Sequence, residues 1–129
     1  MPQDYREILD YNQTAYEYLS VDGTKDERTK IMTYLSSVKF SKEEINRKMG
    51  DLSPGQRAKI ILTKLDLDGA NVLLLDEPTR NFSPLSIDEL NSVFADFKGA
   101  IFAISHDRSF LTQACDKIYE LNPNGLKEI

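Results

Sequence analysis

The apolar residues in the first half of the chain recur at helical spacing. Residues 24–38 place them three or four positions apart, as on one face of an amphipathic helix. This range begins with a capping box, a Ser or Thr followed three residues later by Glu or Gln, and further boxes open the ranges 41–49 and 53–66. Three helices are therefore predicted. The boxes pair Thr24 with Glu27, Ser41 with Glu44 and Ser53 with Gln56.

The second half carries short continuous apolar runs instead. Val72–Leu75 and Ala100–Ile104 have the length and composition of strands buried on both faces. Lys117–Leu121 is expected to be a third strand, with a final short strand after the turn at Asn122–Gly125.

Helices are predicted between these strands. Ser86 and Glu89 form another capping box, and Asp107–Ala114 has the pattern of a short helix. Alternation of strands and helices is typical of a parallel sheet with crossover helices. The sequence therefore predicts an α/β fold in which a helical unit precedes part of a parallel sheet.

Composition and charge narrow the function classes. The 129 residues carry a net charge of -5, which argues against a free-standing basic nucleic-acid binder but not against a fragment of one. The single cysteine, Cys115, allows no disulfide within the chain, and we interpret it as a small buried hydrophobe. No apolar run is long enough to cross a membrane, and no signal peptide is visible. We therefore expect a cytoplasmic protein.

Two adjacent carboxylates follow the first predicted strand. Asp76 and Glu77 come directly after Val72–Leu75, at the strand end where open α/β sheets bind ligands. Asp76 is suited to hold magnesium through water, and Glu77 to polarise an attacking water. The alternative is a solvated acidic pair at a strand-to-turn junction.

Two further segments carry candidate chemistry. His106, the only histidine, follows the second predicted strand and is suited to contact a phosphate or orient water. Taken alone, it is better interpreted as a satisfied histidine that caps the helix beginning at Asp107. Ser53, Gly55 and Gln56 gather free backbone N–H groups at a helix N-terminus, where anions bind. Taken alone, this segment is an ordinary capping box.

In their order and spacing, LSPGQ, VLLLDEPTR and ISHDRSFL together resemble the ATP-binding cassette (ABC) family, over essentially the whole chain. LSPGQ is similar to its signature motif, LLLDEP to its Walker B strand, and SHDRSFL to its histidine switch in the form typical of the ABC-F subfamily. The resemblance implies that Asp76 holds Mg²⁺ through water, that Glu77 is the general base, and that His106 is the γ-phosphate switch.

The resemblance also implies a second cassette as partner. Ser53, Gly55 and Gln56 would close over ATP held by that cassette, as a head-to-tail sandwich. MPQDY resembles the glutamine loop, which would make Gln3 the residue that senses magnesium and water. Two departures stand out: Pro54 replaces the usual glycine of the signature, and Ser83 stands where the D-loop aspartate is usual.

The phosphate-binding loop of the family, GxxxxGK[ST], does not occur, since none of the six glycines is followed by Lys-Ser or Lys-Thr. The chain therefore resembles the C-terminal part of one incomplete cassette. Residues 1–68 would hold the glutamine loop, helical subdomain and signature helix, and residues 69–129 the Walker B and histidine-switch part of the core. Alone, it is expected to bind ATP weakly or not at all, to hydrolyse none, and to self-associate through open strand edges.

Three function classes remain open at this stage. The leading hypothesis is a fragment of an ABC-F ATPase, a subfamily that acts at the ribosome in translation or antibiotic resistance. The second is a nucleotide-binding subunit that docks on the membrane subunit of an ABC transporter. The third is a truncated domain without catalytic activity.

Overall fold

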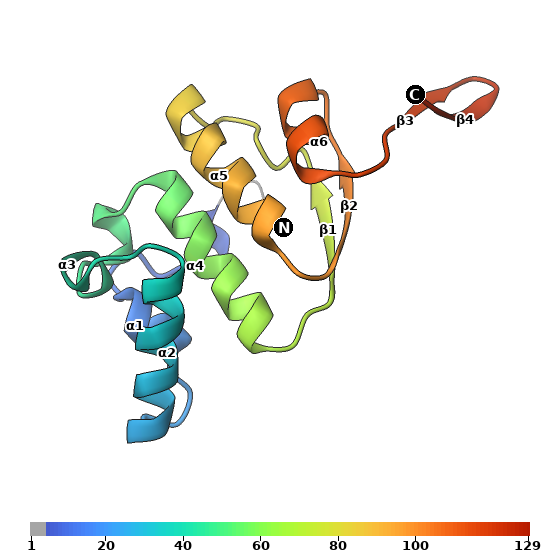
Figure 1. The fold of residues 1–129 in the computed structure, drawn as a ribbon. Helices are drawn as coiled ribbons and strands as arrows, with labels where there is room; N and C mark the ends of the chain where they lie inside the picture. Colours follow the sequence, from blue (N-terminus) through green and yellow to red (C-terminus); the bar gives the residue numbers. More distant parts are fainter. Residues whose placement is uncertain (1–4) are drawn as a thin grey trace.

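The structure, a computed structural model, describes residues 5–129, and its first half is helical as predicted (Figure 1). α2, α3 and α4 occupy the three predicted ranges, although α3 is only one turn long and is followed by a separate 3-10 turn. The helical elements are the 3-10 turn Tyr5–Glu7, α1 (Ala15–Leu19), α2 (Lys25–Ser37), α3 (Lys42–Ile45), the 3-10 turn Met49–Asp51 and α4 (Pro54–Leu67).

Side chains close the starts of these helices. The boxes at Ser41 and Ser53 are complete, with both reciprocal hydrogen bonds present. The box at Thr24 is only half formed: its hydroxyl accepts from the Glu27 N–H, but the Thr24 N–H donates to Asp22 Oδ1 at 2.8 Å in place of the Glu27 carboxylate. The Glu27 carboxylate instead accepts from three loop amides, because the tight loop before α2 presents several unpaired N–H groups together. These are the amides of Val21, Asp22 and Gly23.

The second half alternates strand and helix. β1 pairs with β2 in parallel, and Leu74 lies opposite Phe102 in the register. α5 begins at Pro84, with Ser83 as its N-cap, so the predicted capping box at Ser86 is wrong; a proline suits the first helical position, because its missing N–H would have no partner there. The elements are β1 (Val72–Asp76), α5 (Pro84–Asp96), β2 (Ala100–Ile104), α6 (Arg108–Ala114), β3 (Tyr119–Asn122) and β4 (Gly125–Glu128).

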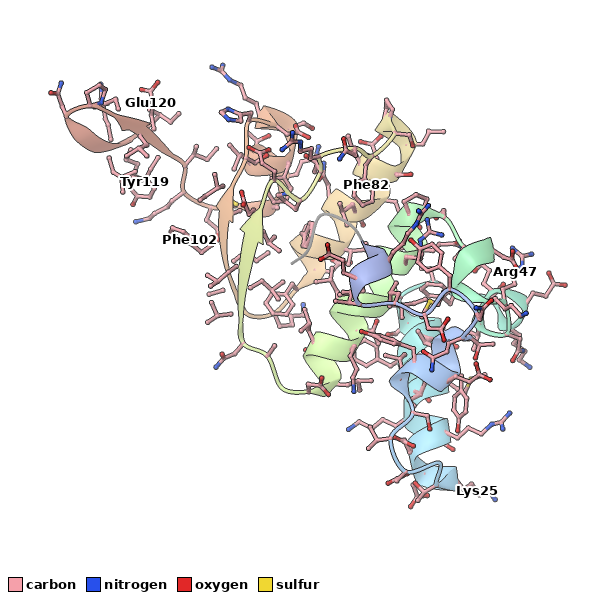
Figure 2. The ribbon with its side chains drawn as sticks, turned by 180° about the vertical axis from the view of Figure 1, so that it is seen from behind. Lys25, Arg47, Phe82, Phe102, Tyr119 and Glu120 are labelled. Carbon is pink, nitrogen blue, oxygen red and sulfur yellow. The ribbon has the colours of Figure 1, made fainter. Side chains whose placement is uncertain are left out.

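The parallel sheet is covered on one face only, so the predicted burial on both faces is wrong. Leu73 and Leu75 are buried, whereas Leu74 and Phe102 are 68% and 67% exposed. Figure 2 shows Phe102 pointing to the side of the strands away from the helices. The continuous apolar pattern indicates strands that are suited to burial on both faces. The described chain has helices packed on only one of those faces.

The third predicted strand does not join this sheet. β3 pairs antiparallel with β4, and the two form a separate hairpin. In Figure 1 this hairpin extends away from the body of the molecule. Leu121 and Leu126 lie directly opposite each other in it and are both more than two-thirds exposed. The final short strand is confirmed, but its partner is β3 alone.

One continuous core joins the helical half to the covered sheet face. α5 and α6 meet through Phe94 and Phe110, whose rings are 5.6 Å apart at an interplanar angle of 75°. This edge-to-face arrangement is favourable for two aromatic quadrupoles. The core therefore fixes α6, and with it the loop that follows β2.

The core contains a buried side-chain amide, that of Asn91. It is fully buried in α5, and neither its Oδ1 nor its Nδ2 makes a hydrogen bond with the part of the chain that the structure describes. An unsatisfied buried polar group costs about 1–3 kcal/mol. We therefore expect Asn91→Leu to raise the free energy of unfolding, by about 1–3 kcal/mol, in urea denaturation followed by circular dichroism. Asn71→Leu, at an exposed site, is the matched control; an equal gain in both variants would contradict the explanation.

Candidate functional site

The ends of the two parallel strands bring Glu77 and His106 together. Asp76 is opposite Ile104 in the register, and the Glu77 N–H donates to the Ile104 carbonyl at 2.8 Å. The pairing thus continues one residue beyond β1. It places the Glu77 side chain beside the loop that carries His106.

Glu77 and His106 face each other across a short gap. The Glu77 Oε1 lies 3.6 Å from the His106 Nε2, with the carboxylate 21% and the imidazole 98% exposed. Glu77 also has a left-handed backbone, with φ of 46°. Such a conformation costs an ordinary residue about 1–3 kcal/mol and is concentrated at functional sites. This half-buried carboxylate next to an exposed imidazole is suited to accept a proton from a water bound between the site and a ligand.

The loops that carry Glu77 and His106 are fixed by burial and hydrogen bonds of the residues that follow them. After Glu77, Pro78 and Thr79 are buried, and the Arg80 N–H returns to the Glu77 carbonyl at 3.1 Å. After His106, the Asp107 carboxylate accepts from the Ser109 and Phe110 amides and so caps α6. Both loops therefore start from fixed backbone.

Asp76 lies at the end of β1 and is exposed. Within residues 5–129, no group of three or more His, Cys, Asp or Glu side chains gathers in a way that would hold a metal ion. A magnesium ion at Asp76 would therefore take most of its ligands from water and phosphate oxygens, which is the usual environment of Mg²⁺ in nucleotide sites. The residues present fit that mode of binding.

The predicted anion site lies at the start of α4. The Ser53 Oγ accepts from the Gln56 N–H at 3.1 Å, and the Gln56 Oε1 accepts from the Ser53 N–H at 2.9 Å. The Gln56 side chain also donates to Glu44 Oε1 at 2.9 Å, which ties α3 to α4. Hydrogen bonding from Ser41 first, and also from Gln56, lowers the pKa of the Glu44 carboxyl. The side chains of the cap are thus fixed before any ligand arrives.

Gly55 is buried beneath a side chain of α5. A Cβ at this position would overlap the Glu89 carboxylate, which pairs with Lys59 Nζ at 2.8 Å. Sequence reasoning missed this contact, because it assigned Glu89 to a capping box at Ser86 and nothing local links it to α4. A larger residue here would have to displace the Glu89 side chain, so glycine leaves the Glu89–Lys59 pair undisturbed.

The site residues form two groups. Glu77 and His106 lie together with Asp76 at the strand ends, whereas Ser53, Gly55 and Gln56 lie at the start of α4, which in Figure 1 is beside α3 and away from those strand ends. Gln3 lies outside the described residues.

Comparisons with known proteins agree on the family. Residues 1–80 match the family model described as "ABC transporter". YkpA of Bacillus subtilis, named as an ABC transporter ATP-binding protein, is 41% identical over 93 residues, which cover 72% of this chain and 17% of YkpA. The energy-dependent translational throttle protein EttA of Escherichia coli is 31% identical over 128 residues, which cover 96% of this chain and 23% of EttA. The chain thus spans about a fifth of the length of these relatives.

Solved structures show the same fold. The post-hydrolysis dimer of the ATP-binding cassette MJ0796, bound to ADP and Pi, matches with a TM-score of 0.65 at 17% identity, over 95% of this chain and 58% of that one. A putative metal-chelate type ABC transporter matches with a TM-score of 0.67 at 17% identity, over 92% of this chain and 53% of that one. Among the described helices, none combines the length and hydrophobicity that a membrane span needs.

Proposed function

Because this chain belongs to the ABC transporter family of ATP-binding cassettes, we propose that it supplies the water-activating carboxylate and the signature surface of an ABC-F ATPase. The observation that carries the proposal is Glu77, held in a left-handed conformation at a strand end and facing His106 at 3.6 Å. The domain division at residues 68 and 69, between α4 and β1, is part of the same proposal.

The proposed chemistry is hydrolysis of the terminal phosphate of ATP. Glu77 accepts a proton from water as the water oxygen bonds to the γ-phosphorus, and the bond from that phosphorus to the bridging oxygen breaks to release ADP. In this proposal the His106 imidazole donates to a γ-phosphate oxygen or holds the water, which its exposure and its position 3.6 Å from Glu77 support. Asp76 holds Mg²⁺ through water, and the ion, when bound, neutralises phosphate charge.

A second cassette is the proposed partner. Ser53 and Gly55 begin α4 far from the chain's own Glu77 site, and the N–H groups at a helix start attract phosphate. The MJ0796 cassette, whose fold this chain shares, is a dimer in its post-hydrolysis state. In such a pair, the Ser53 end of α4 would contact ATP that the other cassette holds.

Two settings for this ATPase are distinguishable. The similarity to EttA, a translational throttle protein, and to the ABC transporter F family member 5 of Arabidopsis thaliana (28% identical over 98% of this chain) favours action at the ribosome in the cytoplasm. The similarity to YkpA, named as an ABC transporter ATP-binding protein and 41% identical over 72% of this chain, favours a nucleotide-binding subunit on a membrane partner, and it is the second candidate. EttA and the Arabidopsis protein match more of this chain, 96% and 98%, than YkpA does.

The experiment that tests the proposal is a chimera in which residues 1–129 replace the aligned segment of EttA. We expect the purified chimera to hydrolyse ATP with magnesium, and its ATP-bound form to co-sediment with ribosomes. Hydrolysis without ribosome binding would move the assignment to the transporter class. A folded chimera without hydrolysis, beside active EttA, would overturn the proposed role of this site.

The isolated chain should not bind ATP measurably. The sequence contains no GxxxxGK[ST] loop, whose backbone N–H groups and lysine supply much of the phosphate binding. We expect no heat of Mg-ATP binding in isothermal titration calorimetry, and no change with Glu77→Gln. Clear magnesium-dependent binding would show that residues 1–129 contain a phosphate site of another kind.

The isolated chain should self-associate. The uncovered sheet face carries Val72, Leu74, Phe102 and Ile104, each more than half exposed, and parallel sheets are ordinarily covered on both faces. We expect the mass from light scattering to rise with protein concentration, and Leu74→Lys with Phe102→Lys to suppress this rise. A monomer at all concentrations would contradict the expectation.

A further inference from the structure

Arg57 projects from the second turn of α4 into the backbone that precedes the helix. Its Nη1 donates to the Leu52 carbonyl at 2.6 Å and to the Met49 carbonyl at 3.2 Å. Its Cζ lies 4.8 Å from the centroid of the Tyr11 ring, and its Nε is buried without a partner. One side chain thus contacts two segments about forty residues apart in the sequence.

Those two segments are also joined by backbone hydrogen bonds. The Met49 N–H donates to the Gln13 carbonyl at 2.7 Å, and the Gly50 N–H donates to the Tyr11 carbonyl at 3.0 Å. Gly50 is packed directly against Tyr11, since a Cβ added there would lie 3.3 Å from the Tyr11 carbonyl oxygen. Arg57 lies over this junction, and we call its contacts with Leu52, Met49 and Tyr11 the clasp.

The position of the charge is informative. A cation in the first turns of a helix is disfavoured by the helix dipole, and burial of part of a guanidinium adds a desolvation cost. Two carbonyl oxygens and an aromatic face offset these costs at Arg57. A lysine has a single point charge, and it cannot stack on the ring and keep the planar donor geometry at once.

We propose that Arg57 is a positioning residue for the signature motif. By holding the Leu52 carbonyl, it fixes the residue directly before Ser53 and so orients the start of α4. Through Tyr11 and Met49, it ties that start to the N-terminal segment. The functional part of this inference rests on the proposed function, in which Ser53 contacts a nucleotide; the clasp itself does not.

The first test uses amide hydrogen exchange by NMR on the chain itself. Arg57→Met should speed exchange at the Met49 and Gly50 amides by about tenfold or more, as expected for losing hydrogen bonds from a charged group. Exchange at α2 amides should stay unchanged. Arg57→Lys should act in the same direction. Arg47→Met is the matched control, because Arg47 is half exposed and makes only a 3.8 Å pair with Glu43.

Unchanged exchange at Met49 and Gly50 would contradict the proposed role of Arg57 in holding this junction. An equal increase at every protected amide would contradict it too, because it would indicate global destabilisation.

The second test places Arg57→Met in the EttA chimera. A positioning role predicts a kcat lowered about tenfold or more with a smaller change in KM for ATP, because in this proposal Arg57 acts on the nucleotide only through the orientation of Ser53. An unchanged kcat beside faster exchange would limit Arg57 to a structural role. An inactive parent chimera would instead refute the proposed function and leave the exchange result standing.

Discussion

Glu77→Gln in the EttA chimera should reduce ATP hydrolysis by about 100-fold or more, the range expected for loss of a general base. Gln has nearly the same shape as Glu, so the substitution should preserve the hydrogen bond from the residue 77 N–H to the Ile104 carbonyl. The left-handed backbone should cost Gln the same conformational energy as it costs Glu. The amide oxygen can accept a hydrogen bond from water but cannot take up its proton at neutral pH. Only the chemical step should therefore change.

The measurement is steady-state phosphate release, together with ATP affinity from a fluorescent nucleotide. We expect the affinity to change little, because the role proposed for Glu77 is toward the attacking water and not toward the nucleotide base or ribose. Glu120→Gln is the matched control, since Glu120 lies on the exposed β3–β4 hairpin (Figure 2). A Glu77→Gln variant that keeps a third or more of the rate would remove Glu77 from the general-base role.

His106 should contribute less than Glu77. Its imidazole is 98% exposed and lies 3.6 Å from the Glu77 carboxylate, so a ligand would have to provide most of the interactions that orient it. Of these two residues, only Glu77 has a left-handed backbone, with φ of 46°. Within the pair, the backbone strain therefore lies on the proposed general base.

Local signals made the helix starts predictable. Ser41 and Ser53 carry their capping partners three residues away, and each box forms as expected because all its atoms lie within one turn. Thr24 shows where the rule ends. Glu27 has the correct spacing, yet its carboxylate accepts hydrogen bonds from three loop amides and not from the Thr24 N–H. The outcome depends on the shape of the preceding loop, which the spacing does not encode.

The sequence predicts the parallel pairing of the strands correctly, but not which faces of the sheet are covered by helices. The continuous apolar runs indicate strands suited to burial on both faces, and β1 and β2 do pair in parallel. The exposure of Leu74 and Phe102 depends on which segments pack on the strands, and no pattern within a strand contains that information. The same reason explains the third strand, which pairs with β4 as a local hairpin in place of joining β2.

The candidate site was predictable to a similar extent. Neighbouring parallel strands end at one edge, so the meeting of Glu77 and His106 follows from two local motifs. The contact of Glu89 with Gly55 and Lys59 does not follow, because it requires the packing of α5 on α4.

Phe110→Ala should destabilise the chain by about 3–5 kcal/mol, the usual cost of truncating a buried Phe. Phe110 is fully buried and packs edge-to-face on Phe94, so its removal leaves a cavity between α5 and α6. Natural domains have a total stability of about 5–15 kcal/mol. A chain with one sheet face uncovered has less buried apolar surface to offset this loss, so we expect a large unfolded fraction at 25 °C.

Leu85→Ala provides the control, because it truncates a side chain of α5 that is 84% exposed. Its effect on urea denaturation, followed by far-ultraviolet circular dichroism, should stay within about 0.5 kcal/mol. Equal losses in the two variants would mean that the α5–α6 contact does not stabilise the fold. Phe110→Leu, a smaller change, should leave the chain folded at a cost of about 1 kcal/mol. Because Asp107, the N-cap of α6, directly follows His106, exchange at the Ser109 and Phe110 amides in this variant would show how firmly the core holds the His106 loop.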